Sequence, residues 1–193
     1  MITGTKVKLR GKRIEDGALD YQWHTDPELS DLDAVAPLRI CYSDFMEEYR
    51  EQLRYPSPSR RSFAIETRDG KHIGNCVYYN IDRVNRETEV GIMVGDRDYW
   101  DKGYGESAVV ALVDFIYRHT GFHRVYLKTL EKNVRAQNCF RKCGFTACGR
   151  MERDGYNFLL MELARPSWKQ QYARRKREAK APQSAYEETP RNR

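Results

Sequence analysis

Apolar and polar residues alternate in residues 6–11, and this period of two predicts a strand at the start of the chain. Apolar residues then recur every three or four positions in residues 14–24 and 42–55, which is the spacing of a helix with one buried face. Ser43 is expected to cap the second of these helices. The chain therefore opens with one strand and two helices.

The next three apolar stretches predict an antiparallel sheet. Asp69 and Gly70 separate residues 62–67 from residues 71–81. Asp-Gly between two strands is a strong hairpin signal because both residues tolerate a positive φ. A polar turn then leads to a third strand at residues 87–95, so we expect an antiparallel meander.

Beyond residue 100 the pattern changes to one in which helices and strands are interspersed. Helices are expected at residues 103–119 and 133–142, the second ended by Gly144, and strands at residues 123–129, 145–152 and 156–163. This order of elements predicts one domain of α/β (α+β) class.

The net charge of +6 is confined to the C-terminal part of the chain. Residues 165–193 contain nine Lys or Arg and three acids, whereas the 25 bases and 25 acids of residues 1–164 cancel. A neutral body argues against a domain built around a nucleic-acid groove. We expect one domain at residues 1–164, then a basic C-terminal helix and tail at 165–193, disordered from residue 181 onward. Residues 174–177 either make a weak contact with RNA or the ribosome, or form a solvated helix end.

Several protein classes are disfavoured by the composition. No apolar run approaches the roughly 20 residues of a membrane span, and residues 1–13 are charged, without the apolar centre of a secretory signal. The five cysteines lack zinc-site spacing and are expected to be reduced thiols. These features predict a cytoplasmic protein with no membrane partner and no metal.

The segment that says most about chemistry joins the meander to the long helix. Gly103 and Gly105 lie there, where glycine lets the backbone approach a ligand closely. The first amides of a helix lack internal acceptors, and with the helix dipole they can bind a pyrophosphate. The segment is neither a Walker A loop nor a convincing dinucleotide fingerprint, and a plain tight turn remains the alternative.

Three segments together resemble a known family. They are Trp100-Asp-Lys-Gly-Tyr-Gly-Glu-Ser-Ala108, Asn133-x-x-Ala136 followed by Gly144-Phe145, and Glu89-Val-Gly-Ile92. The N-terminal residues from Val7 to Pro27 fit as well. Over residues 6–164 the chain resembles the GNAT acetyltransferase superfamily, in particular its ribosomal-protein N-terminal and polyamine acetyltransferases.

The resemblance implies a mixed central sheet, splayed at an acetyl-CoA site and flanked by helices. It also implies that a primary amine attacks the thioester directly in a ternary complex, with proximity, an oxyanion donor and removal of one proton supplied by the protein. The pantetheine would pair with the central strand, the pyrophosphate would rest on loop amides, and further contacts would come from the short helix. The residues implied to bind acetyl-CoA are Ile92, Met93, Val94, Asp101, Lys102, Gly103, Tyr104, Gly105, Glu106, Ser107, Asn133 and Phe140.

Two of these residues depart from the family pattern. Phe140 stands where many members have a tyrosine that protonates the leaving thiolate. A thiol with a pKa of about 8.5 leaves without such an acid, and water, Cys139 or Tyr104 are the substitutes available. Asp101 stands beside the expected diphosphate. If its carboxylate points inward it would weaken CoA binding, whereas a carboxylate that points to solvent would not.

Glu89 is the candidate catalytic base. On a strand it shares one face with Gly91 and Met93, close to the expected cofactor gap, and related polyamine enzymes carry an acid at the matching place. Its carboxylate would take the ammonium proton through a water. The alternative is a strand carboxylate paired with Arg86 or Lys128.

The acceptor is indicated only by charge. Residues 26–51 contain eight acids against two bases, a negative field that would attract a polyamine-like amine, although the acids also suit a solvated helix face. A protein N-terminus is an equal alternative. Two other functions stay open, a catalytically silent acyl-CoA-binding module and an RNA- or ribosome-associated protein acting through its basic tail. A homodimer is open as well.

Overall fold

The computed structural model describes residues 1–179 of the chain. In this part, eight strands form one sheet: β1 (Ile2–Thr3), β2 (Val7–Gly11), β3 (Arg60–Thr67), β4 (His72–Asp82), β5 (Glu87–Val94), β6 (Arg124–Leu130), β7 (Thr146–Arg153) and β8 (Tyr156–Ala164). The helices are α1 (Gly17–Thr25), α2 (Pro27–Leu32), α3 (Tyr42–Arg54), α4 (Tyr104–His119), α5 (Val134–Lys142) and α6 (Arg165–Glu178), with 3-10 turns at Ile14–Asp16 and Arg97–Tyr99. The predicted class, a mixed sheet flanked by helices, is confirmed.

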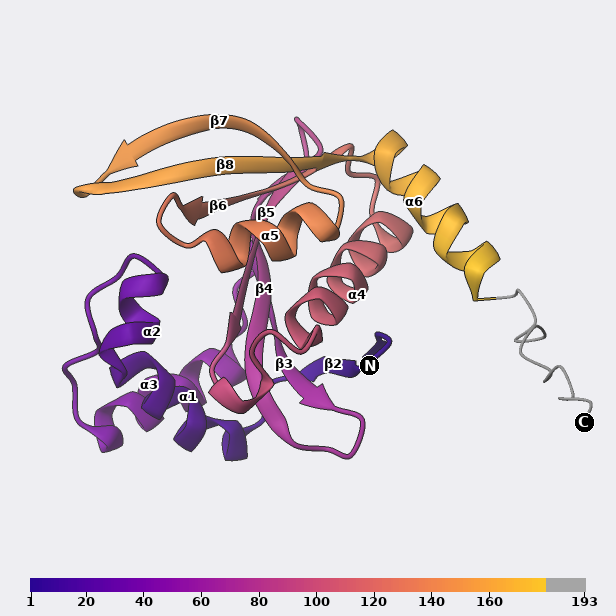
Figure 1. Ribbon diagram of the computed structural model, residues 1–193. Coiled ribbons are helices and arrows are strands. Elements are labelled where there is room, and N and C mark those ends of the chain that lie inside the picture. Colours follow the sequence, from indigo (N-terminus) through magenta and orange to yellow (C-terminus); the bar gives the residue numbers. More distant parts are fainter. Residues whose placement is uncertain (180–193) are drawn as a thin grey trace, which may run out of the picture.

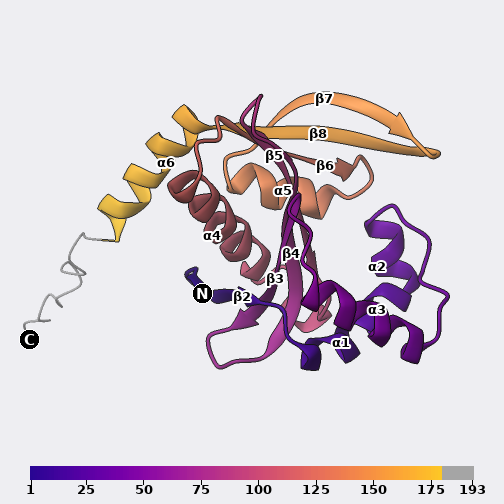
Figure 2. The same ribbon diagram turned by 180° about the vertical axis from the view of Figure 1, so that it is seen from behind.

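The sheet separates into two halves at its only parallel pair of strands among the described residues. The strand order is β1-β2-β3-β4-β5-β6-β8-β7. β5 and β6 pair only at residues 87–89 and 124–126, whereas β5 stays paired with β4 up to Val94 and β6 with β8 up to Leu130. Beyond that short contact the two halves diverge, as Figures 1 and 2 show from opposite sides.

α4 packs its apolar face on the sheet and carries much of the core. Val109, Leu112 and Ile116 are almost completely buried. Burying each such side chain contributes about 1.5–3 kcal/mol relative to leaving it exposed. The N-terminal turn of α4 is also held by residues 5 and 6, because the Ser107 hydroxyl accepts hydrogen bonds from the Thr5 hydroxyl at 3.1 Å and from the Lys6 amide at 2.9 Å. The start of α4 is therefore a fixed point beside the gap.

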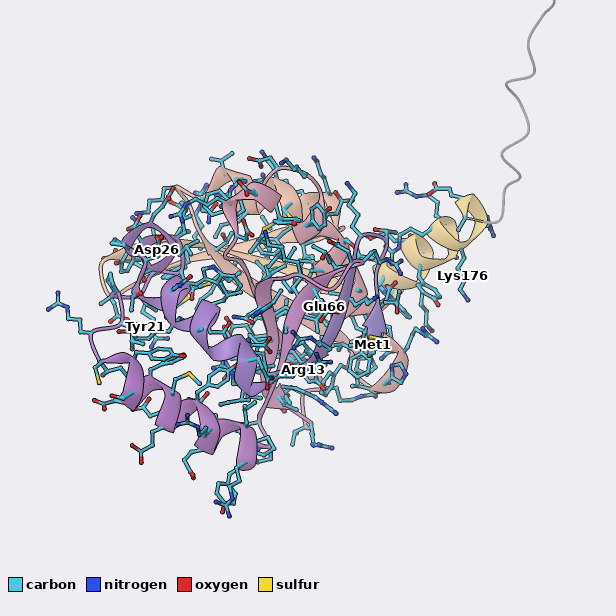
Figure 3. All side chains as sticks on the ribbon, turned by 90° about the horizontal axis from the view of Figure 1, so that it is seen from below. Met1, Arg13, Tyr21, Asp26, Glu66 and Lys176 are labelled. Carbon is cyan, nitrogen blue, oxygen red and sulfur yellow. The ribbon has the colours of Figure 1, made fainter. Side chains whose placement is uncertain are left out.

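α1, α2 and α3 gather at one end of the molecule, away from α6 (Figure 1). In the view from below, Tyr21 lies on the side of α1 that faces α3 (Figure 3), and its ring centroid is 5.3 Å from those of Tyr42 and Phe45. The hydroxyl of Tyr49 on α3 donates a hydrogen bond of 3.0 Å to the buried Asp20 on α1. These contacts hold the helices together as one layer.

The structure corrects the predicted start of the chain in three places. β1 and α2 were not expected, although Asp26 caps α2 by accepting a hydrogen bond of 3.0 Å from the Leu29 amide. The N-cap of α3 is Cys41, and the predicted cap, Ser43, lies inside the helix.

The basic helix expected after residue 164 is present as α6. Its first half packs on α4, where the buried Trp168 ring lies 5.1 Å from the Tyr117 ring and its Nε1 donates to Asp114. Within residues 1–179 no helix is long and apolar enough to cross a membrane. The disorder predicted for residues 181–193 lies outside the described residues.

Candidate functional site

The divergence of β5 and β6 opens a cavity of about 780 Å³. Its walls come from residues 90–94 of β5, from residues 128–130 of β6, from α5 and from the loop before α4. Part of α2 and the start of β8 close the other end. The cavity therefore joins segments that are far apart in the sequence.

Free backbone amides mark one end of this cavity. Gly103 is the N-cap of α4 with a φ of +78°, a conformation that favours glycine. The Ser107 amide donates to the Gly103 carbonyl at 3.0 Å, so the unsatisfied amides of the helix are those of residues 104–106. Gly103, Gly105 and Glu106 line the cavity, which places this anion-binding turn at its wall.

Two cationic side chains on α5 lie at the same cavity and were missed by sequence reasoning. Arg135 and Lys142 line it, and the Arg135 guanidinium lies 3.5 Å from the centroid of the Trp100 ring. The indole Nε1 of Trp100 donates to the Val94 carbonyl at 2.6 Å, which fixes the ring. Arg135 falls inside the Asn133-x-x-Ala136 segment, so its place in a segment already expected to contact the cofactor could have indicated it as a binding residue.

The structure brings together most of the residues that the resemblance implied for acetyl-CoA. Those that line the cavity are Ile92, Met93, Val94, Asp101, Gly103, Gly105, Glu106, Asn133 and Phe140. The Lys102 Nζ atom instead donates to a backbone carbonyl of its own turn, and the Tyr104 ring packs against Tyr99. Ser107 does not line the cavity, since its amide donates within the helix and its hydroxyl accepts from the Lys6 amide at 2.9 Å.

Asp101 lies at the edge of the cavity and is exposed to solvent. Its φ is +55°, a left-handed conformation that aspartate tolerates better than most residues with a side chain. The carboxylate therefore sits beside the free amides of α4 without being enclosed by them.

Glu89 is buried behind the cavity wall, with 4% of the residue exposed. Its Oε1 atom accepts hydrogen bonds from the Tyr79 hydroxyl at 2.6 Å and from the Lys128 Nζ at 2.9 Å. Its Oε2 atom accepts a hydrogen bond from the side-chain Nδ2 of Asn80 at 2.9 Å. Of the two partners considered from the sequence, Lys128 is paired with it, whereas Arg86 donates to the Gly121 carbonyl.

The side chains around Glu89 connect it to the cavity. Tyr79 and Lys128 both line the cavity and both contact the carboxylate. Asn80 reaches it because a bulge in β4 gives this residue a φ of +49°. Burial and the neighbouring carboxylate raise the pKa of Tyr79, so its hydroxyl keeps its proton at neutral pH.

The residue pair expected near the thioester lies on α5. Phe140 is buried and contacts Phe145 edge to face, so this ring is fixed where it lines the cavity. Cys139 also lines the cavity, and the neighbouring Cys143 thiol lowers the pKa of the Cys139 thiol. Tyr104, the other proposed substitute acid, is not among the lining residues.

The structure separates the eight acids of residues 26–51 by their surroundings. Asp26 and Glu28 pair with Arg97, and Asp31 pairs with Lys132. The acids on α3 are exposed, as expected for a solvated helix face; they are Asp44, Glu47, Glu48 and Glu51. Asp33, by contrast, lines the cavity.

Comparison with known proteins agrees with this geometry. A family model described as Acetyltransferase (GNAT) domain matches residues 6–146. The chain belongs to the GNAT acetyltransferase family. The predicted family, and with it an N-acetyltransferase that uses acetyl-CoA as donor, is thereby confirmed; the narrower subgroup stays a prediction.

Individual relatives of this GNAT protein are distant. An uncharacterized N-acetyltransferase p20 of Bacillus licheniformis is 27% identical over 134 residues, which are 69% of this chain and 72% of the relative. The spermidine N-acetyltransferase of Vibrio cholerae, solved with CoA and spermine, superposes with a TM-score of 0.75 at 16% identity, over 85% of this chain and 98% of that one. The aminoglycoside acetyltransferase AAC(6')-Ib with coenzyme A gives 0.72 at 19% identity, over 86% and 99%. Both structures share the fold.

The basic cluster of α6 is partly neutralised. Arg175 bonds Asp114 at 2.7 Å and Arg174 approaches Glu178 at 3.5 Å. Lys176 and Arg177 are exposed. A contact of the tail with RNA or the ribosome stays a prediction.

Within residues 1–179, no group of three or more His, Cys, Asp or Glu could hold a metal ion.

Proposed function

We propose that the protein transfers acetyl from acetyl-CoA to a primary amine inside the cavity between β5 and β6, by direct attack in a ternary complex. The observation that carries the proposal is the early end of β5–β6 pairing, which opens a cavity onto the free amides of α4. Two proteins that share the fold were solved with CoA together with spermine or kanamycin, so this architecture accommodates a donor and an amine acceptor at once.

The residues at the α4 end fit a ligand with a diphosphate and an extended amide-bearing arm. The amides of residues 104–106 offer donors to phosphate oxygens, and Arg135 and Lys142 supply positive charge. In the described part of the chain, no strand pairs with the cavity side of residues 90–94 of β5. That edge can pair with amides of the arm, except at the Val94 carbonyl, which accepts from Trp100.

The residues at the other end suit proton removal from an ammonium group. Glu89 is proposed as the proton acceptor, and it acts through Tyr79, whose hydroxyl lies between the carboxylate and the cavity. A hydroxyl so placed accepts a proton from the amine while passing its own to Glu89, and the raised pKa of Tyr79 prevents it from remaining a phenolate. The Lys128 Nζ atom pairs with the Glu89 carboxylate at 2.9 Å.

The leaving thiolate needs little help. A thiol of ordinary pKa, about 8.5, is a good leaving group, so Phe140 in place of an acid does not prevent transfer. Phe140 instead closes the cavity wall with an apolar ring that excludes water from the reacting atoms.

The test is the release of free thiol from acetyl-CoA with polyamines, aminoglycosides and peptides with free N-termini. Release with one class identifies enzyme and acceptor together. CoA binding without release across the panel would contradict acetyl transfer to these amines and would favour the silent acyl-CoA-binding module.

A further inference from the structure

The cavity carries one carboxylate at the end away from α4. Asp33 directly follows α2, whereas the other acids that line the cavity, Asp101 and Glu106, belong to the loop and first turn of α4. In Figure 1, α2 lies to the left of β5, whereas α4 lies to its right. Asp33 is therefore placed to meet an acceptor rather than the donor's phosphates.

The carboxylate of Asp33 has no protein partner in residues 1–179. The two cations that face it are Arg60 on β3 and Lys128 on β6, and neither forms an ion pair or hydrogen bond with it. Lys128 is engaged by Glu89 at 2.9 Å, and the Arg60 Nε donates to Ser62.

The surroundings make the charge of Asp33 costly. Although the residue is exposed at the cavity mouth, the protein around its carboxyl raises the pKa to about 6 in spite of both cations. At neutral pH this is an ionised carboxylate that accepts no side-chain hydrogen bond or ion pair from residues 1–179.

Apolar side chains from the α2 region and from β8 line the same cavity as Asp33. Leu29, Leu32 and Val35 come from α2 and the loop after it, and Phe158 comes from β8. Such walls accept methylene groups, while the single carboxylate accepts a cation. In the proposed function the reacting amine meets Tyr79, which lines the same cavity and whose pKa is raised by burial, by Glu89 and by Asp33.

We propose that Asp33 binds a second, non-reacting ammonium group of the acceptor, which selects amines that carry two cationic groups joined by a short aliphatic chain. The proposal rests on the acetyl transfer proposed above and names the residue that sets acceptor preference. Because Asp33 binds only when ionised, the KM for a diamine rises as the pH falls below about 6, where Asp33 loses its charge while both amino groups stay protonated.

The experiment compares 1,5-diaminopentane with n-pentylamine at saturating acetyl-CoA, since the two differ only in the second amino group. We expect the wild type to favour the diamine at least tenfold in kcat/KM, with the difference in KM. Asp33→Asn should bring that ratio to about one. Asp44→Asn, the same change on the exposed face of α3, should keep it. An unchanged ratio in Asp33→Asn would overturn the proposal.

Failure of the subsite can be told from failure of the enzyme function. If the wild type acetylates both amines equally well, the transfer stands and the role of Asp33 is refuted. If neither amine is acetylated, calorimetric titration of 1,5-diaminopentane into the CoA-loaded protein decides. Binding to the wild type that is at least tenfold weaker in Asp33→Asn supports the subsite, and equal or absent binding refutes it.

Discussion

The two ends of the cavity are built in different ways. The end at α4 consists largely of backbone: a left-handed Gly103, free amides and an unpaired strand edge. The other end consists of side chains, with Asp33, Tyr79 and Lys128 brought together from three separate elements. A backbone site serves a constant ligand, and a side-chain site can change its ligand by substitution. We therefore expect side-chain substitutions at the second end to change the acceptor while the end at α4 keeps its donor.

The largest effect on turnover should come from removing the charge of Glu89 at the side-chain end. Glu89→Gln should lower kcat about 100-fold or more, the usual contribution of general acid–base catalysis, and should alter the pH profile of kcat while leaving the Kd for CoA unchanged. It should also destabilise the fold by about 1–3 kcal/mol, because Lys128 loses its charged partner. Steady-state kinetics, calorimetry and urea unfolding measure the three quantities.

A double variant separates stability from chemistry. Glu89→Gln with Lys128→Met removes both charges and should recover most of the stability without recovering turnover. Normal turnover in the single variant would refute Glu89 as the proton acceptor.

CoA binding at the backbone end should be weakened by an added negative charge and not by an added methyl group. Gly105→Asp places a carboxylate on the first turn of α4 and should raise the Kd for CoA at least tenfold, about 1.4 kcal/mol. A Cβ at this position meets only ordinary contacts, 3.7 Å from the Cys139 Sγ and 3.8 Å from Val94, so Gly105→Ala is the matched control. Calorimetric titration with CoA checks both, and equal affinities would place the diphosphate elsewhere.

The cost of the Asp33 carboxylate should be visible in stability. A carboxyl whose pKa is raised on folding binds its proton more tightly in the folded state, so its contribution to stability falls as the pH rises from about 4 to about 6. Asp33→Asn should therefore raise the Tm at about pH 8. The expected rise is only roughly 2 °C, because solvent screens the charge of an exposed group. At about pH 4 the two proteins should melt together. A lower Tm at pH 8 would mean that Asp33 has a stabilising partner.

The smallest effect concerns the edge of the backbone end. Asp101→Asn keeps a residue that tolerates the left-handed conformation and removes the negative charge beside the amides of α4. CoA should then bind about two- to fivefold more tightly, and the gain should shrink as salt is added. The same affinity at low salt would show that the carboxylate is screened.

The sequence predicted the backbone end far better than the side-chain end. The strand, the glycines and the long helix are contiguous, so residues 87–119 carried most of that end in one segment. α2 was missed although Asp26 and Pro27 are a recognisable start, because the helix is too short for a periodic pattern. Tyr79 had no local signal, and Asp33 was only one of the eight acids of residues 26–51, since only the tertiary fold brings these two residues to one cavity.

Glu89 shows the limit of a periodicity argument. Strand alternation placed it close to the gap, and it lies immediately behind the cavity wall. Alternation could not predict the bulge at Asn80, nor the contacts that Tyr79 and Lys128 make with Glu89 from the neighbouring strands. Those contacts are the reason why we propose that Glu89 acts through Tyr79, whereas the sequence suggested a water in that place.

Hydrogen–deuterium exchange with and without CoA tests whether the donor binds between β5 and β6, because it locates the bound donor without requiring an acceptor. We expect CoA to slow exchange of the amides at residues 90–94 and 104–106 and along α5, with little change in β2, β3 or α6. Protection confined to other elements, or no protection at saturating CoA, would contradict a donor site between β5 and β6.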